Sequence, residues 1–303
     1  MKRRTFIAGI GSAVAWPLVA RAQNYPTQPI TIIVPFAAGG PMDTLTRVLA
    51  ESMSPLLGQR VLVENVTGAG GSIGVGRVAR APPDGYTLID GIWTTHVTNA
   101  IVYKLKYDVL NDFAPIALLT INSNFIVARK SLPANNLQEM IAWLRDNPGK
   151  ALAGTGGVGS PQHIMAIFFQ SITGTRFQFA HYRGAAPAMQ DLVAEHVDLL
   201  VTDAVTPLPH IRAGTIKAYA VTSTERLATA PEVPTTDEAG LPEFHTSVWN
   251  AVWAPKRTPT DIIAKLNSAI VDGLNDTTVR QRLADLGQQV VPRQQQKIGR
   301  AHV

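Results

Sequence analysis

The sequence has 303 residues, and its composition excludes several classes of protein. Because it contains no cysteine, disulfide bridges, thiolate metal sites and a cysteine nucleophile are all excluded. Four of the 27 basic residues lie within the first 21 positions, which leaves 23 against 22 acidic residues in the remainder. That near-neutral remainder has no stripe of Lys and Arg, so nucleic-acid binding is not expected.

The first 22 residues have the layout of a bacterial secretory signal. A basic start with the pair Arg3-Arg4 is followed by an apolar run over 6–19 and by the small-residue sequence Ala20-Arg21-Ala22. The paired arginines resemble the twin-arginine type of signal. The apolar run is shorter than the roughly 20 residues that cross a bilayer. We therefore expect cleavage after about Ala22 and a periplasmic protein of 281 residues, a length that suits two lobes.

Short apolar, β-rich runs alternate with helical patterns along the rest of the chain. The predicted strands cover 30–36, 60–65, 86–93, 124–130, 150–155, 177–182, 197–203, 217–223 and 248–255. This alternation predicts an α/β fold with mostly parallel sheets. A two-lobed chain without a linker often crosses between its lobes more than once, and we expect crossings near 120–126 and 222–250.

Apolar periodicity and capping residues predict four helices between these strands. The first has apolar residues at 45, 48, 49 and 53; the second covers 136–147; the third starts at Ser160-Pro161; and the fourth starts at Thr258-Pro259. In the second helix, Glu139 stands three residues after Asn136, which is the spacing of a capping box. In the third and fourth, proline at the first helical position has the φ angle that a helix needs.

Three turns from a strand into a helix are rich in glycine. They read PFAAGGPMD (35–43), ENVTGAGGSIG (64–74) and GTGGVGSPQH (154–163). A helix N-terminus presents unpaired N–H groups and the positive end of its dipole, and glycine lets an anion approach them closely. Several such turns at the carboxyl ends of strands predict a site for a small carboxylate or a phosphate.

Phosphate is the less favoured of these two anions. Gly154, Gly156 and Gly159 fit the dinucleotide-binding spacing, but no acidic residue follows about 20 positions later to bind a ribose hydroxyl. The sequence also lacks a P-loop lysine, so no nucleotide cofactor is expected. Asp43 has two interpretations. An acidic residue in a first helical turn pairs with the helix dipole, and one in a glycine-lined loop can also orient water or bind a ligand amine or hydroxyl.

Motifs of hydrolases and metal sites are missing from the sequence. It contains neither G-x-S-x-G nor H-E-x-x-H, and its seven histidines show no ligand spacing. Ser160, His163 and Asp203 can be combined into a hypothetical catalytic triad. A capping serine and a histidine in the first helical turn explain the first two more simply. We expect no catalytic residue and no metal.

Several blocks of the sequence carry a more specific resemblance. They include YPTQPITIIVPFAAGGPMDTLTRVLAESM, LGQRVLVENVTGAGGSIGVGRVARAPPDGYTLI, GVGSPQHIMAIFFQSITG, HYRGAAPAMQDLVAEHVDLLVTD, LPHIRAGTIKAYAVTS, PEVPTTDEAGLPEF and WNAVWAPKRTPTDIIAKLNSAI. In this order they resemble the substrate-binding proteins of tripartite tricarboxylate transporters, the Bug or TctC family. The resemblance extends from about residue 25 to about residue 292.

The resemblance implies a two-lobed periplasmic binding protein of the class II type. Each lobe is a mixed or parallel sheet flanked by helices, and the ligand cleft lies between the lobes. We expect lobe 1 to comprise 23–122 and 230–303, and lobe 2 to comprise 123–229. Such a protein closes over a small organic acid, here a C4–C6 dicarboxylate or an aromatic acid, without a cofactor. As a monomer, it delivers that acid to one large and one small membrane subunit.

The resemblance also implies which residues contact the ligand. From lobe 1 they are Phe36, Ala37, Ala38, Gly39, Gly40 and Asp43 in a first loop, whose amides hold a carboxylate partly through water, and Asn65, Gly70 and Gly71 in a second loop. From lobe 2 they are Gly156, Gly157, Ser160 and His163 in a third loop, then Tyr182 and Arg183, with Asp203 nearby.

The end of the chain departs from the family. Residues 293–303 have no apolar helical period where relatives continue into a last helical segment, so we expect an atypical tail that suggests truncation. Three functional hypotheses follow. The chain is a solute-binding protein of a transporter, a periplasmic serine hydrolase that uses Ser160 and His163, or a truncated ligand sensor.

Overall fold

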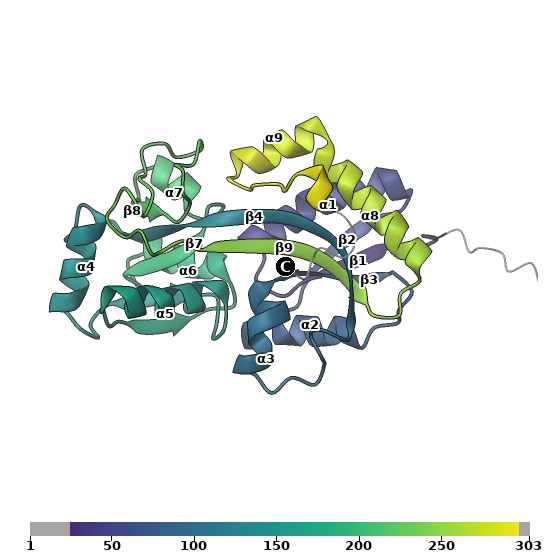
Figure 1. The fold of residues 1–303 in the computed structure, drawn as a ribbon, viewed down its shortest axis with the longest axis horizontal. Coiled ribbons are helices and arrows are strands. Elements are labelled where there is room, and N and C mark those ends of the chain that lie inside the picture. Colours follow the sequence, from purple (N-terminus) through teal and green to yellow (C-terminus); the bar gives the residue numbers. More distant parts are fainter. Residues whose placement is uncertain (1–24, 297–303) are drawn as a thin grey trace, which may run out of the picture.

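The structure is a computed structural model and describes residues 25–296. The predicted signal and its cleavage point lie outside these residues, as do residues 297–303 of the predicted tail. Figure 1 shows two halves side by side, each with strands flanked by helices. Two long strands, β4 (Phe113–Arg129) and β9 (Ser247–Pro255), lie next to each other where the halves meet. The predicted two-lobed α/β architecture is therefore confirmed.

The first half is built on β1 (Ile30–Val34), β2 (Val61–Asn65) and β3 (Thr87–Ile92). The strand order is β2-β1-β3-β9-β4, in which β1 is parallel to β2 and β3 and β9 is antiparallel to β3 and β4. Its helices are α1 (Pro41–Leu57), α2 (Ser72–Ala79), α3 (Asn99–Val102), α8 (Thr260–Asn275) and α9 (Thr277–Asp285), with short helical turns at Ala69–Gly71, Thr94–Thr98 and Arg293–Gln295.

The second half contains the strands β5 (Leu152–Thr155), β6 (Gln178–His181), β7 (Leu199–Asp203) and β8 (Ile216–Val221). The order is β4-β7-β5-β6, with β8 also paired to β4. Strand β5 is parallel to β6 and β7, whereas β4 is antiparallel to β7 and β8. The helices are α4 (Leu137–Asp146), α5 (Pro161–Thr173), α6 (Ala185–Val193) and α7 (Leu208–Arg212).

Strand β4 belongs to both halves. It pairs with β9 as far as Ser123 and with β7 from Asn124 onward, so the change of partner falls between two adjacent residues. The apolar pattern of the sequence predicts this strand only from residue 124. The preceding part, FAPIALLTINS, contains Pro115, which cannot donate a ladder hydrogen bond, and the register of β4 shifts directly after it. The pairing of residues 113–123 with β9 keeps this part of β4 extended.

The chain stays with the second half for longer than expected. Residues 230–246 were expected in lobe 1, but Ala230 and Val233 pack in the apolar core around β7 and β8. Phe244 stacks on Phe168 of α5, and Thr235 forms a bridge with Val221. These contacts put the return to the first half at about Ser247. This point lies within the crossing expected near 222–250, but residues 222–246 contain no strong periodic pattern that would place it more narrowly.

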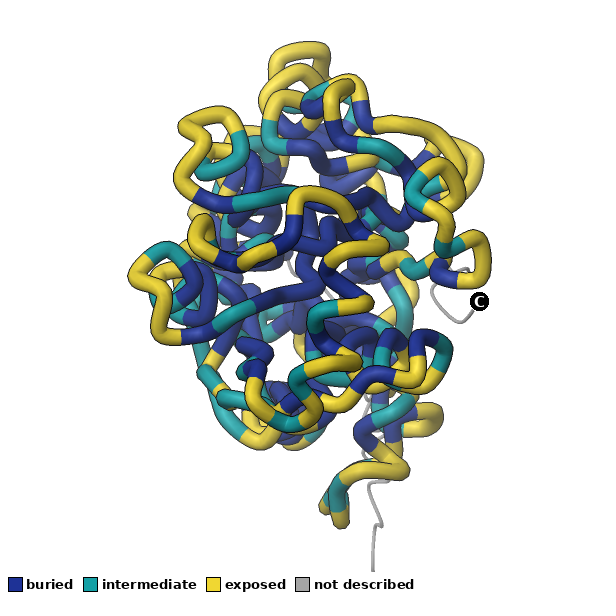
Figure 2. Tube along the Cα trace, turned by 90° about the vertical axis from the view of Figure 1, so that its left-hand side faces the viewer, coloured by how far each residue is buried: buried dark blue, intermediate teal, exposed yellow. Residues whose placement is uncertain are grey.

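The starts of α4 and α5 follow from the predicted capping residues, whereas α8 begins at Thr260, with Pro259 before it and no side-chain cap, one residue later than expected. The side chain of Asn136 accepts the amide of Glu139 at the start of α4, and that of Ser160 accepts the amide of His163 at the start of α5. Figure 2 shows buried segments in the interior and exposed segments on the outer loops. Within residues 25–296, no helix has the length and apolar character needed to cross a bilayer.

Candidate ligand-binding site

A cavity lies between the two halves. Its lining comes from three sources: the first loop and the start of α1, the starts of α5 and α6, and the strands at the junction. The lining residues are Phe36, Ala37, Gly40, Pro41, Met42, Asp43, Ile92, Asn124, Pro161, Gln162, Ala185, Asp203, Val248 and Asn250. Both halves therefore contribute to one site.

Three helices begin at this cavity. The residue before α1 is Gly40 and the residue before α6 is Gly184, and neither start has a side-chain cap. The first turns of these helices therefore retain N–H groups that no capping side chain satisfies. Helix α5, whose first residues Pro161 and Gln162 also line the cavity, is capped by Ser160. The positive ends of three helix dipoles thus favour an anion in the cavity.

The first loop is held in shape by Asp43. Its carboxylate accepts hydrogen bonds from the Gly39 amide (2.9 Å), Arg47 Nε (2.9 Å) and Asn65 Nδ2 (2.9 Å). Asn65 also donates to the carbonyl of Phe36 (3.0 Å), which ties the second loop to the first. Burial by itself favours the neutral acid, but the bonds from Arg47, Gly39 and Asn65 outweigh it and lower the pKa of Asp43.

These contacts decide between the two interpretations of Asp43. It is buried and ionised, and Gly39 of its own loop, Arg47 of α1 and Asn65 at the second loop occupy both of its oxygens. We therefore assign it the role of shaping the loop that holds a ligand. Ala38 and Gly39 of the same loop are exposed and lie outside the cavity lining, whereas Phe36, Ala37 and Gly40 belong to that lining.

The two halves touch directly at the edge of the cavity. The amide of Ala37 donates to the carbonyl of Arg183 (2.9 Å), and the hydroxyl of Tyr103 donates to the carbonyl of Val158 (2.6 Å). Both bonds join the first half to the second. Gly70 of the second loop faces the third loop so closely that a Cβ on it would lie 2.5 Å from the oxygen of Val158. The structure therefore shows a closed arrangement.

The junction supplies polar groups on the strand side of the cavity. Asn124 and Asp203 are cross-strand partners, and Asn250 lies on the neighbouring β9. Asp203 Oδ1 accepts hydrogen bonds from the Val205 amide (3.0 Å) and from Gln288 Nε2 (3.2 Å). Asn124 Nδ2 donates to Thr246, whereas its buried Oδ1 has no hydrogen-bond partner. An unpaired acceptor in a lined cavity is suited to a donor on a ligand.

Asp203 has the most altered acidity among the cavity residues. Its burial raises the pKa to about 7, and the bonds from Val205, Asn122 and Gln288 oppose that rise only in part. The carboxyl is therefore protonated for much of the time near neutral pH. In its neutral form it can donate a hydrogen bond to an acidic ligand instead of repelling it.

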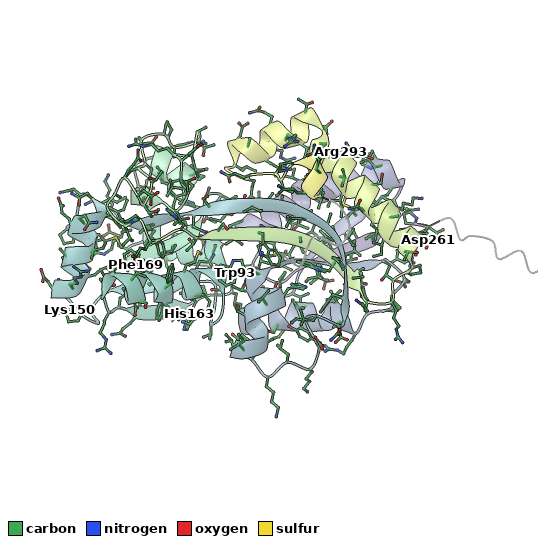
Figure 3. The ribbon with its side chains drawn as sticks, in the orientation of Figure 1. Trp93, Lys150, His163, Phe169, Asp261 and Arg293 are labelled. Atoms are coloured by element: carbon green, nitrogen blue, oxygen red, sulfur yellow. The ribbon has the colours of Figure 1, made fainter. Side chains whose placement is uncertain are left out.

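Ser160 and His163 have the contacts of a helix start. Ser160 is fully buried, and its Oγ accepts the amide of His163 (3.4 Å) as the cap of α5. His163 Nδ1 accepts the amide of Gly159 (3.2 Å). Figure 3 shows His163 at the end of α5 nearer to the first half. No bond links His163 to Asp203, whose Oδ1 is bound to Val205 and Gln288.

Other predicted residues support the site without lining it. The second and third loops meet at Gly70 and Gly157. A Cβ added to Gly157 would lie 3.9 Å from the nitrogen of Gly70. A Cβ added to Gly71 would meet Thr95 and Pro35, and one added to Gly156 would meet Gln162. Tyr182 donates its hydroxyl to Asp191 (2.5 Å), and Arg183 contributes its carbonyl. These residues set the shape of the loops.

Sequence patterns missed the lining residues that β3 and the junction strands β4 and β9 contribute. Ile92, Asn124, Val248 and Asn250 line the cavity but belong to no glycine-rich turn. The available signal was an asparagine in the middle of an apolar strand, as in SNFIVA and WNAVWA, since a buried amide needs a partner.

Within residues 25–296, no group of three or more metal-ligating side chains is placed to hold a metal ion.

Comparison with known families identifies the chain. The sequence model of the tripartite tricarboxylate transporter family receptor, TctC, matches residues 45–301. The chain belongs to this family. The match spans both halves and the junction between them, which confirms the resemblance seen in the sequence.

Solved structures of similar sequence share this fold. The periplasmic binding protein BugD is 39% identical, with a TM-score of 0.85 over 88% of this chain and 89% of its own. MatC from Rhodopseudomonas palustris, solved with bound malate, is 38% identical, with a TM-score of 0.86 over 89% of this chain and 93% of its own. The R. palustris protein Rpa4515, solved with adipate, is 33% identical, with a TM-score of 0.85 over 89% of this chain and 91% of its own. Chains of this family are thus periplasmic binding proteins for transport.

Proposed function

We propose that this TctC-family chain captures a small dicarboxylate in the cavity between its halves and delivers it to a tripartite transporter. The observation that carries the proposal is the convergence of the starts of α1, α5 and α6 on one cavity formed by both halves. The lining contains no Lys or Arg, so helix ends and amides attract the anion. Fixed dipoles bind a carboxylate without a direct ion pair that would slow its release.

The junction residues favour a ligand with a second polar group. A carboxylate at the uncapped start of α1 leaves Asn124, Asp203 and Asn250 for the other end of the ligand. The free Oδ1 of Asn124 suits a hydroxyl, and the neutral form of Asp203 suits a second carboxylate. Malate has both groups, and MatC binds it. An aromatic acid is the second candidate, because Phe36, Ile92 and Val248 give the cavity an apolar wall.

Capture would proceed by hinge closure. The crossing strands β4 and β9 are the connections at which one half can rotate against the other. Ligand contacts with both halves, together with the bonds from Ala37 to Arg183 and from Tyr103 to Val158, favour the closed form. We place the halves at about 25–122 with 247–296, and at about 123–246.

The remaining parts of the proposal concern location, partners and chemistry. The signal at 1–22 directs the chain to the periplasm and is removed after about Ala22. The mature chain acts as a monomer and docks on one large and one small membrane subunit. It catalyses no reaction, because the cap role of Ser160 and the acceptor role of His163 Nδ1 leave neither in the geometry of a nucleophile and its base.

A thermal-shift panel tests this function. Malate, succinate, adipate, benzoate and aspartate are added to the purified chain, and an ester substrate is assayed in parallel. A true ligand at 100 times its Kd stabilises the folded state by about 2.7 kcal/mol. We expect a clear rise in Tm with at least one dicarboxylate and no ester turnover. A flat panel with a folded far-UV spectrum contradicts capture of these acids, and turnover that Ser160→Ala abolishes supports a hydrolase.

A further inference from the structure

Residues 156–159 of the third loop are the part of the second half that meets the first half beside the cavity. Its Val158 carbonyl accepts the hydroxyl of Tyr103, and a Cβ on Gly159 would lie 3.1 Å from Asn99 Oδ1. The backbone of the loop also approaches Gly70. Closure on a ligand therefore requires this loop to hold one conformation.

A histidine holds the C-terminal end of this loop. The amide of Gly159 can only donate, so His163 Nδ1, 3.2 Å away, must be the acceptor. His163 is therefore neutral here and carries its proton on Nε2. A second proton would go to Nδ1 and place two donors face to face. The bond to Gly159 exists only while His163 is uncharged.

A second histidine lies against the first. The rings of His163 and His181 are 5.0 Å apart between centroids and nearly perpendicular, and Phe179 packs 4.8 Å from the ring of His163. His181 Nδ1 lies 2.7 Å from Thr155 Oγ1, and that oxygen accepts the amide of Gly157 (3.3 Å). The pair is therefore linked to both ends of the loop, directly at Gly159 and through Thr155 at Gly157, and two charged rings at this separation would repel each other.

The surroundings of His163 favour its neutral form. Its own burial is the main cause that lowers its pKa, and the charge of His181 on β6 lowers it further. Burial also lowers the pKa of His181. Across the contact between the halves, burial raises the pKa of Tyr103, so that hydroxyl keeps its proton. Among the described residues that hold His163, Phe179, Ser160 and the Gly159 amide are uncharged.

We propose that His163 is a positioning residue for the third loop and makes ligand capture sensitive to acid. Protonation of His163 breaks its bond to Gly159, releases the loop and weakens the Tyr103 contact, so the open form is favoured. This regulates the same site and rests on the proposed function. The family resemblance implies that His163 contacts the ligand. Because His163 is not part of the cavity lining, the proposal gives it a different role.

The direction of the pH effect follows from linkage. The closed form needs neutral His163, whereas the open form can take up a proton near the ordinary histidine pKa of about 6.5. The contribution of His163 to the affinity is therefore constant above about pH 6.5, and it makes the affinity fall below that pH. The fall is at most tenfold per pH unit for one proton, and it ends once the pH is below the pKa of the closed form.

The test is a calorimetric titration of the full mature chain with malate between pH 5.0 and 8.0. We expect the wild-type affinity to fall at least threefold between pH 6.5 and 5.5. His163→Asn, whose amide oxygen can accept from Gly159 but does not titrate, should keep the affinity at pH 7 and lose the fall. His163→Phe should bind weakly at every pH. His210→Asn is the control, because His210 also bonds through Nδ1, to Thr215 on the surface near α7.

NMR titration of the ligand-free chain separates this proposal from the proposed function. The amide signal of Gly159 should move with the titration of His163 and should not move in His163→Asn. If malate fails to bind while Gly159 follows His163, the ligand assignment is wrong and the loop device stands. If malate binds but its affinity is flat between pH 5.0 and 7.0, or still falls in His163→Asn, the proposal is overturned.

Discussion

The two halves hold their ligand loops by different chemistry. In the first half, the loop before α1 is fixed by Asp43, Arg47 and Asn65, and the bonds to the carboxylate keep it ionised well below neutral pH. In the second half, the loop before α5 depends on His163, and the cavity wall contains Asp203, whose pKa is about 7. One loop keeps its shape over the whole physiological range, and the other half responds to pH.

This difference indicates a division of roles. A permanently shaped loop can receive a carboxylate in the open form, because its donors do not need the second half. The half whose groups titrate near neutrality then decides how well closure holds that ligand. Variants of the first half should therefore change affinity equally at all pH values, and variants of the second half should change the pH profile.

The largest effect is expected from Asp43→Ala. The change removes the acceptor of three donors in a buried position, and we expect a loss of about 2–4 kcal/mol in the free energy of unfolding. Chemical denaturation measures it. Malate affinity should fall by a similar factor at pH 6, 7 and 8. A pH-dependent loss would contradict the division between the halves, and Asp261→Ala, at an exposed first turn of α8, is the matched control.

Gly184→Ala should block closure. A Cβ on Gly184 would lie 2.9 Å from the amide nitrogen of Ala37, so the halves cannot approach as closely. We expect at least a tenfold loss of malate affinity by calorimetry, with little change in the stability of the ligand-free chain. Gly214→Ala is the control, since its φ is also positive (+64°, against +157° at Gly184) but an added Cβ meets no atom within 4 Å. If both substitutions reduce malate affinity equally, backbone strain and not the blocked contact causes the loss.

Asp203→Asn should change the alkaline side of the pH profile. Above about pH 7 the wild-type carboxyl becomes charged and repels a dicarboxylate, so affinity falls by up to tenfold per pH unit. The asparagine cannot ionise and should remove this fall while leaving the acid side unchanged. Calorimetry with malate at pH 6.5 to 8.5 measures it. If the wild type binds equally across this range, Asp203 does not face the charge of the ligand.

The smallest effect is expected at Asn124. Its unpaired Oδ1 should accept the hydroxyl of malate, so the wild type should prefer malate to succinate by about 1 kcal/mol, roughly fivefold. Asn124→Ala should reduce this preference to near unity. The affinity ratio in calorimetry isolates the hydroxyl from any general loss of affinity. A ratio that survives the substitution would assign the hydroxyl to another group, with Asn250 as the next candidate.

Sequence patterns were sufficient for the elements that carry their own signals. All nine predicted strands are present, and the capping residues Asn136 and Ser160 begin helices as expected, because caps and periodicity act over a few residues. The glycine-rich turns before α1 and α5 lead into helix starts that line the cavity, whereas the second turn only contacts the third loop beside it. The first part of β4 and the assignment of 230–246 were missed, because both depend on pairing with segments far away in the chain.

The same distinction between local and long-range signals applies to the site residues. The amino-acid sequence by itself determined that glycines precede three helices and that the chain resembles transporter receptors, since both depend on residue identity in order. Only the tertiary structure decided that Asp43 serves its own loop, that His163 accepts a backbone amide, and that asparagines of the junction strands line the cavity. Hydrogen-bond direction and burial arise from groups that lie far apart in the chain, so no local pattern contains them.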